Sequence, residues 1–192
     1  LIPLLAQHGL EIKDVSFSSF NGGCFRTVVG HLHPGTQPSP RVSQALTEEN
    51  QFLRLDIWRE WGLQVQQELK KTSDWLLRMG VQDKRVYLYG ASNRGNTLLQ
   101  IIASNFYGGV AALPHLLPFA VERQEAKVGK VMAAAGGIPI ISEEEMRAGP
   151  PDALLIAPWF LGDVFVQREA KFLADGGLFV FPLPHFEIVG GT

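Results

Sequence analysis

The stretch at residues 85–102, RVYLYGASNRGNTLLQII, constrains the fold more than any other part of the sequence. Its residues 86–89 are aliphatic or aromatic side chains that favour a buried strand. Gly90 interrupts this run, and residues 96–100 then have the composition of a helix. A strand that turns at glycine into a helix directs backbone N–H groups and the positive end of the helix dipole at one point, where an anion is favoured. The sequence therefore predicts an anion site at this turn.

The composition narrows the class of protein. A chain of 192 residues, 46% hydrophobic and 19% charged, is typical of a soluble globular protein. The 17 basic residues are scattered and the formal net charge is −2, which argues against a nucleic-acid-binding surface. The single cysteine, Cys24, excludes disulfides and thiolate zinc sites within the chain. No apolar run approaches the roughly 18–20 residues that a membrane span needs. We expect a cytoplasmic protein that binds no metal, nucleic acid or membrane.

The opening residues predict a hairpin that follows a short helical segment. The sequence begins without Met and without a signal-peptide pattern, so we expect a piece of a longer chain. Apolar and polar residues alternate at 10–17, and a second strand pattern follows at 25–32. Asn21 and Gly22 lie between these segments and are typical of a tight antiparallel turn. The proline-rich residues 33–40, HPGTQPSP, then predict a linker.

A long helical region is expected at residues 41–79. Ser39 can cap it with Pro40 in the first helical position, and Gly80 can end it. A continuous helix of this length would reach about 60 Å at ~1.5 Å per residue, so we expect a break near Thr47 or Gly62. Trp58 and Trp61 recur at helical spacing with later apolar residues, and we interpret both as core residues.

The second half of the chain changes to an alternating pattern. Strands are predicted at 86–89, 118–121, 138–141, 153–157 and 178–181, and helices at 96–104, 142–147 and 163–174. This alternation indicates an α/β fold with a Rossmann-like, mostly parallel sheet covered by helices. Ligands bind such sheets beyond the carboxyl ends of the strands, near the point where the strand order reverses. The segments expected there are 90–96, 122–123, 159–160 and 182–185.

Two nucleotide-binding patterns almost fit the central turn. Residues 90–95 approach the dinucleotide pattern G-x-G-x-x-G. The middle glycine of that pattern lets the backbone approach a pyrophosphate closely, and here Ser92 replaces it. The P-loop pattern fails at Asn96, where a lysine must bind the terminal phosphates. The turn therefore predicts neither an NAD site nor NTP hydrolysis.

A hydrolase pattern is the third alternative. Ser92 would be the nucleophile of G-x-S-x-G, with Asp163 and His185 completing a Ser–Asp–His order, but Arg94 occupies the second glycine position. The groups that remain at the turn, including the guanidinium of Arg94, suit a diphosphate. A plain strand–helix turn capped by its own Ser and Asn side chains explains the same residues. The pattern alone does not choose between these two readings.

Five blocks of sequence, in order, resemble the C-terminal domain of SAM-dependent nucleotide-sugar C-methyltransferases. They are YGASNRGNTLLQ at 89–100, AVERQEAKVGK at 120–130, GIPIISEEEM at 137–146, PDALLIAPW at 151–159 and EAKFLADGGLFVFPLP at 169–184. Enzymes of this family add a methyl group to a ring carbon of a dTDP-linked deoxysugar. Residues 8–29 resemble the last strands of the family's methyltransferase domain.

This resemblance implies how the chain is divided into segments and which functions of the full-length enzyme it lacks. Residues 1–33 would be a hairpin remnant of the upstream SAM methyltransferase domain, 34–80 a linker and long helical region, and 81–192 the Rossmann-like C-terminal domain. The full-length family enzyme uses SAM, but this chain has no counterpart of the SAM loop, the zinc module or the catalytic Glu–His pair. We therefore expect the chain to bind no cofactor, to contain no catalytic residue and to be inactive alone.

The resemblance also assigns the expected binding site. The domain would bind the diphosphate of a dTDP-sugar-like substrate, with the upstream methyltransferase domain and a second copy of the chain as further partners. The expected substrate-binding residues are Gly90, Ala91, Ser92, Asn93, Arg94, Gly95, Asn96, Glu122, Arg123 and Trp159. Trp159 would pack on the sugar or base, or simply in the core. The alternative is a non-catalytic structural or oligomerisation domain that binds no nucleotide.

Overall fold

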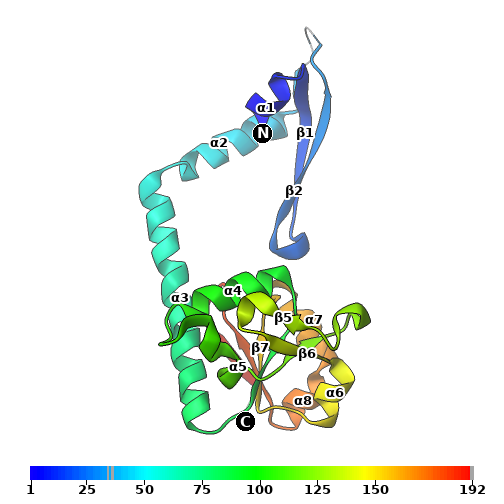
Figure 1. The fold of residues 1–192 in the computed structure, drawn as a ribbon. Coiled ribbons are helices and arrows are strands. Elements are labelled where there is room, and N and C mark those ends of the chain that lie inside the picture. Colours follow the sequence, from blue (N-terminus) through cyan, green and yellow to red (C-terminus); the bar gives the residue numbers. More distant parts are fainter. Residues whose placement is uncertain (34, 36, 191–192) are drawn as a thin grey trace. The chain divides into compact units, whose positions relative to one another are not determined.

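The fold is described by a computed structural model that covers residues 1–33, 35 and 37–190. Pro34 and Thr36, within the predicted linker, lie outside the described residues, as do the last two residues. The chain forms two compact units, Leu1–Gly62 and Leu63–Thr192 (Figure 1). The predicted division at 33/34 and 80/81 stays a prediction.

The first unit is built on the predicted hairpin. Its elements are α1 (Ile2–Ala6), β1 (Leu10–Ser18), the helical turn η1 (Phe20–Gly22), β2 (Cys24–His31) and α2 (Pro40–Phe52). β1 and β2 pair antiparallel, and the turn between them places Asn21 at φ 53° and Gly22 at φ 86°, as the Asn-Gly signal predicts. Ser39 precedes α2 as predicted, but its hydroxyl donates to the Asp14 carboxylate of β1 at 2.5 Å. This contact fastens α2 to the hairpin.

The predicted long helix does break, but at neither of the expected positions. α2 ends at Phe52 and α3 (Leu55–Val81) begins three residues later, because Leu53 leaves the helical backbone region with ψ 49°. Asp56 in the first turn of α3 lies where the helix dipole favours an acid. Thr47 and Gly62 both remain helical. The predicted end at Gly80 is also wrong, because α3 continues to Val81 and the chain then turns at Asp83, φ 54°.

The expectation that Trp58 and Trp61 are core residues is wrong. Their side chains are 52% and 57% exposed and contact each other edge to face, with ring centroids 5.7 Å apart. The buried face of α3 begins further along, with Leu69, Trp75 and Leu76. Helical spacing correctly marks one face, but it does not show how far along that face a core extends.

The second unit contains a seven-stranded sheet. Its strands are β3 (Val86–Tyr89), β4 (Ala120–Glu122), β5 (Val131–Met132), β6 (Ile138–Ser142), β7 (Ala153–Ile156), β8 (Leu178–Phe181) and β9 (Glu187–Gly190). The order is β5-β6-β4-β3-β7-β8-β9. The five central strands are parallel, which confirms the predicted sheet. The antiparallel edge strands β5 and β9 were not predicted, because a two-residue strand and a short strand after a proline-rich segment give no clear periodicity.

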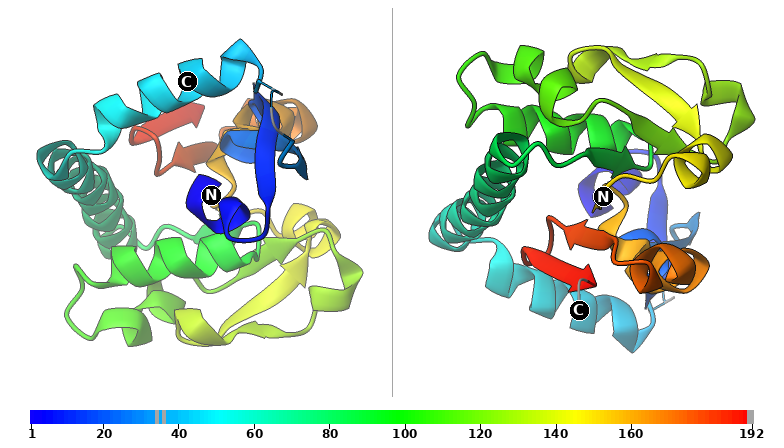
Figure 2. Two further views of the ribbon diagram at one scale, coloured as in Figure 1. Left: turned by 90° about the horizontal axis from the view of Figure 1, so that it is seen from above. Right: turned by 90° about the horizontal axis from the view of Figure 1, so that it is seen from below.

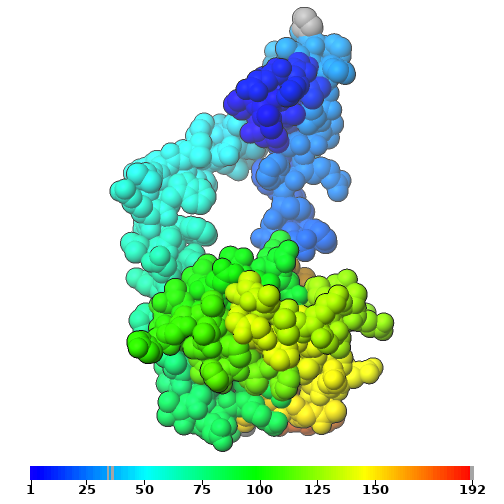
Figure 3. Space-filling model, viewed as in Figure 1, coloured from blue at the N-terminus to red at the C-terminus, as the bar shows by residue number. Residues whose placement is uncertain are grey.

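Helices cover both faces of this sheet. On one face α3 packs with α4 (Asn93–Ala103) and α5 (Leu113–Leu116), and on the other α6 (Glu143–Ala148) packs with α7 (Gly162–Arg168) and α8 (Ala170–Ala174), as Figure 2 shows. The loops contain the helical turns η2 (Gly109–Ala112), η3 (Glu125–Lys127), η4 (Ala133–Ala135) and η5 (Trp159–Leu161). The green and yellow surface in Figure 3 belongs to the segments from α4 to α6. Among the described residues, no helix is apolar over a length that would cross a bilayer.

The second unit has one hydrophobic core on each face of its sheet, and the same strands contribute side chains to both. Leu88 and Leu155 point to the face covered by α4, whereas Tyr89 and Leu154 point to the face covered by α7. Such alternation in strands that are buried on both sides produces the near-continuous apolar runs seen in the sequence. The predicted helix at 163–174 is divided at Glu169, where the side chain is buried between α7 and α8.

Replacement of Leu99 tests how α4 packs on the sheet. Leu99 lies on α4 with no exposed surface, so Leu99→Ala should lower the free energy of unfolding by about 2–5 kcal/mol in urea titrations. Leu77→Ala is the matched control, because Leu77 is 44% exposed on α3 and its replacement should cost less than about 1 kcal/mol. Equal losses in the two variants would contradict the placement of α4 against the sheet.

Candidate functional site

The candidate site lies where the strand order reverses. β3 is the first strand of the sheet along the chain, β4 and β6 follow on one side of it, and β7 and β8 lie on the other. In a parallel sheet this arrangement leaves a crevice between the loops that follow the two strands flanking the reversal. Here those loops begin at Gly90 after β3 and at Ala157 after β7. The central sequence motif therefore lies at the switch point of the sheet.

Two glycines allow these loops to approach closely. Gly90 has φ +100°, and a Cβ there would lie 2.8 Å from Cδ of Pro158. A Cβ on Gly95 would lie 3.1 Å from the carbonyl oxygen of Gly90 and 3.3 Å from Cβ of Ala157. The glycine positions in this motif thus serve a tight turn and close helix–strand packing, two of the three tasks glycine has in dinucleotide folds.

Ser92 begins α4 as its N-cap. Its Oγ accepts the N–H of Gly95 at 3.1 Å, and its backbone is extended at φ −119°, ψ 166°. A hydrolase nucleophile would instead lie exposed on a strained turn. Asp163 and His185 line a pocket beyond η5, and Ser92 is not among the residues lining it. The structure therefore does not bring the hydrolase triad together.

Two cationic side chains lie beside the start of α4. The guanidinium carbon of Arg94 lies 4.7 Å from the ring centre of Phe160 in η5. The ammonium group of Lys127, in η3, donates to the carbonyl of Ala91 at 2.9 Å and to Glu122 at 3.0 Å. Sequence reasoning missed Lys127, although it follows Glu122 by five residues in a block that had been singled out. Only the fold shows that η3 returns to the turn after β3.

Glu122 is hydrogen-bonded within the protein through both carboxylate oxygens. Its Oε1 accepts the backbone N–H groups of Arg123 at 2.9 Å and Gln124 at 3.1 Å, while Oε2 accepts from Lys127. Both carboxylate oxygens thus hold the loop after β4 and position Lys127. The side chain of Arg123 is exposed directly after this strand. Within the part of the chain that the structure describes, Oδ1 of Asn96 is buried without a hydrogen-bond partner, and a buried acceptor favours a donor from water or a ligand.

Trp159 both packs in the core and lines a pocket. It contacts both hydrophobic clusters, and its ring lies edge to face with Phe160, with centroids 6.0 Å apart. The pocket beside it has a volume of about 310 Å³. Its other walls come from α7 and from the loop between β8 and β9. The segments 90–96, 122–123, 159–160 and 182–185 are thus gathered at one edge of the sheet.

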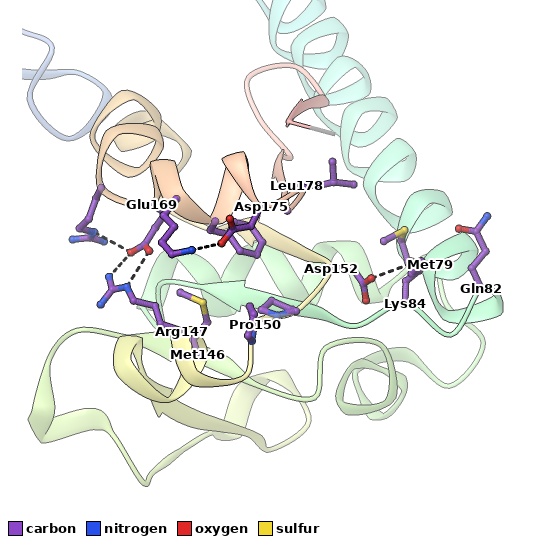
Figure 4. A pocket seen from close by; sticks show the side chains of 16 residues that line it. Met79, Gln82, Lys84, Met146, Arg147, Pro150, Asp152, Glu169, Asp175 and Leu178 are labelled. Atoms are coloured by element: carbon purple, nitrogen blue, oxygen red, sulfur yellow. Dashed lines mark hydrogen bonds and ion pairs between the residues drawn. The ribbon is translucent and has the colours of Figure 1, made fainter. Parts of the chain in front are cut away.

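A larger cavity, of about 620 Å³, lies at the opposite edge (Figure 4). It is lined by residues that precede β3, β7 and β8, among them Lys84, Asp152 and Gly177. Its charges largely pair with each other: Lys84 with Asp152 at 3.0 Å, and Lys171 with Asp175. Parallel sheets bind ligands beyond the carboxyl ends of their strands, so volume alone does not make this cavity the functional site.

A buried ion network closes one end of this cavity. Glu169, 3% exposed, accepts from Arg147 and from the Tyr89 hydroxyl, which in turn accepts from Arg168 at 2.7 Å. Burial, and then the bond to Glu169, raises the pKa of the Tyr89 phenol. The bonds to Glu169 likewise raise the pKa of Arg147. These contacts join α6 to α7 and β3, and among the described residues the Nε of Arg168 is buried without a hydrogen-bond partner.

The geometry defines a class of protein: a doubly wound α/β domain with a cationic helix N-terminus at its switch point. The family model of the C-methyltransferase C-terminal domain matches residues 19–184, and the chain belongs to this family. It is also 24% identical over 192 residues to C-methyltransferase NovU of Streptomyces niveus. That match covers 98% of this chain and 43% of the relative, so the chain spans less than half of that protein's length. The resemblance seen in the sequence blocks is confirmed.

No cluster of three or more His, Cys, Asp or Glu side chains that could hold a metal ion occurs among the described residues.

The loop that carries His185 is tied to α3 by a carboxylate. Glu68 accepts the N–H of Phe186 at 2.7 Å and pairs with Lys71 at 2.7 Å. The bond from Lys71, and then that from Phe186, lowers the pKa of the Glu68 carboxyl below its ordinary value of 4.5. Because the folded pKa is the lower one, these contacts stabilise the fold fully above pH 4.5. Their contribution is lost as the pH falls through the folded pKa.

Glu68→Gln tests this carboxylate. Between pH 7 and about pH 3 the wild-type chain should lose more free energy of unfolding than Glu68→Gln, because the amide cannot be protonated in this range. Urea titrations at a series of pH values measure the difference. Glu144→Gln, at an exposed position on α6, should follow the wild-type curve. If Glu68→Gln followed that curve too, the tether would not contribute to stability.

Proposed function

We propose that this chain binds the nucleotide-sugar substrate of a SAM-dependent sugar C-methyltransferase and holds its diphosphate on the turn at residues 90–96. The observation that supports this most strongly is the convergence of three positive groups at the switch point of the sheet. They are the N-terminus of α4, Arg94 and Lys127. Membership of the C-methyltransferase C-terminal domain family supports a sugar as the attached group.

Each element of the turn has a binding task in this proposal. The first turn of α4 offers N–H groups and the helix dipole to a phosphate. Arg94 carries a guanidinium, a group that can bind two phosphate oxygens, and its guanidinium carbon lies 4.7 Å from the centre of the Phe160 ring. Lys127 adds a point charge, and Glu122 holds it in position. Glu122 is thus proposed as a positioning residue, while Arg123 and Trp159 remain proposed substrate contacts.

The same turn does not fit S-adenosylmethionine. The sulfonium group of that cofactor is cationic, whereas the helix dipole, Arg94 and Lys127 all favour an anion. We therefore derive no step through the cofactor from these residues. The chain's proposed contribution is to bind and orient the methyl acceptor.

Arg94→Ala and Lys127→Met test the diphosphate site. Each should weaken the binding of dTDP by about tenfold in calorimetric titrations, the worth of roughly one charge-assisted hydrogen bond. Binding by the wild type should also weaken as salt increases, because the contacts are ionic.

Arg78→Ala is the control for lost positive charge, since Arg78 is exposed at the end of α3, before the amino end of β3. Its dTDP affinity should equal that of the wild type. Unchanged affinity in both Arg94→Ala and Lys127→Met, with binding present in the wild type, would remove the turn from the proposed function.

A second candidate function, self-association without nucleotide binding, is favoured by the exposed aromatic residues of the first unit. Phe17, Phe20 and Phe25 are at least 60% exposed near the hairpin turn, and Trp58 and Trp61 are exposed on α3. Exposed apolar groups that cluster mark protein interaction sites.

Light scattering separates this candidate from the first. A second copy bound through these aromatic residues predicts a dimeric mass that Trp58→Ser together with Trp61→Ser reduces to that of a monomer. A monomeric wild type would exclude self-association through these residues at the concentration measured. The diphosphate titrations are independent of this result, because their variants lie on other elements.

A further inference from the structure

The carboxyl edge of the sheet is divided by charge. Near β3 and β4 lie three basic residues, Arg94, Arg123 and Lys127, and Lys127 is paired with Glu122. Near β7, β8 and β9 lies the pocket of about 310 Å³, whose charged walls are Asp163 and Glu187. Among the described residues that line this pocket there is neither Lys nor Arg. An anionic group is therefore favoured at the first part and disfavoured in the second.

The walls of this pocket suit an uncharged ring with hydrogen-bond donors. Trp159, Phe160 and Phe181 give it aromatic surface, and rings stack favourably on such surfaces. The carboxylates of Asp163 and Glu187 accept hydrogen bonds but donate none when ionised. His185 lies on the wall formed by the loop between β8 and β9.

The pocket adjoins the diphosphate turn through one residue. Phe160 lines the pocket and also lies beneath the guanidinium of Arg94 at 4.7 Å. Trp159 follows Pro158, and Cδ of Pro158 is the atom that a Cβ on Gly90 would approach most closely. A diphosphate on Arg94 would therefore place a covalently attached ring at the mouth of this pocket.

We infer that the pocket between η5, α7 and the β8–β9 loop binds the uncharged, donor-bearing ring attached to the diphosphate. The inference rests on the proposed function and names the chemistry of one subsite of it. Asp163 and Glu187 are assigned as acceptors for the ring's N–H or O–H groups, and Phe160 as the surface shared with the diphosphate site. A sugar bearing hydroxyl groups and a pyrimidine base bearing an N–H group share this chemistry.

Calorimetric titration of the 192-residue chain with pyrophosphate, dTDP and dTDP-glucose tests the inference. The step from pyrophosphate to dTDP adds thymidine, and the step to dTDP-glucose adds the hexose ring. The double variant carries Asp163→Asn and Glu187→Gln. In it, the gain in affinity from pyrophosphate to dTDP, or the gain from dTDP to dTDP-glucose, should be about five- to tenfold smaller than in the wild type. Its affinity for pyrophosphate itself should not fall. A fall at the step from pyrophosphate to dTDP identifies the nucleoside as the occupant. A fall at the step to dTDP-glucose identifies the sugar.

Asp83→Asn is the matched control, because Asp83 is an exposed carboxylate ahead of β3, at the other edge of the sheet. It should leave both steps unchanged. If neither step changed by more than about twofold in the double variant while pyrophosphate still bound, the pocket assignment would be wrong and the diphosphate site would stand. If the wild type bound none of the three ligands, the proposed function and this inference would both be overturned.

Discussion

The close approach between the loop after β3 and the loop after β7 is the contact on which the candidate site depends. Gly90 and Gly95 allow it, because a Cβ at either position would crowd Pro158 or Ala157. The contact brings the first turn of α4 beside η5 and thereby places Arg94 over Phe160. Sheet order alone would create a crevice here. The two glycines determine how near its walls come and which side chains meet across it.

Charge then divides this edge into parts with different preferences. Lys127, fixed by Glu122, joins Arg94 and the α4 dipole on one side, and Asp163 with Glu187 lies on the other. A molecule with a diphosphate and an uncharged ring matches this division, whereas a ligand that is anionic throughout does not. The buried network around Glu169 lies at the other cavity, where its ion pairs and hydrogen bonds connect α6 with α7. This division of charge is consistent with the proposed task of binding and orienting a substrate.

Much of the second unit could be predicted from sequence, because buried parallel strands leave long apolar runs that few other structures produce. Residues 86–89 and 178–181 were placed to the residue. The prediction that Trp58 is buried was wrong, because helical spacing marks a face of the helix without showing what covers that face. Lys127 could not be found, since its position beside Ala91 arises from the return of η3 to a distant turn. Glu122 stays a predicted site residue, and its partners within the protein are visible only in three dimensions.

The turn after β3 is proposed to receive a diphosphate. The most direct measurement is the change in backbone amide NMR shifts when dTDP-glucose is added to the ¹⁵N-labelled chain. We expect the largest changes at residues 92–96, with smaller ones in η3 and η5. Changes confined to the cavity lined by Lys84, Asp152 and Gly177, or spread evenly over the surface, would contradict this proposal.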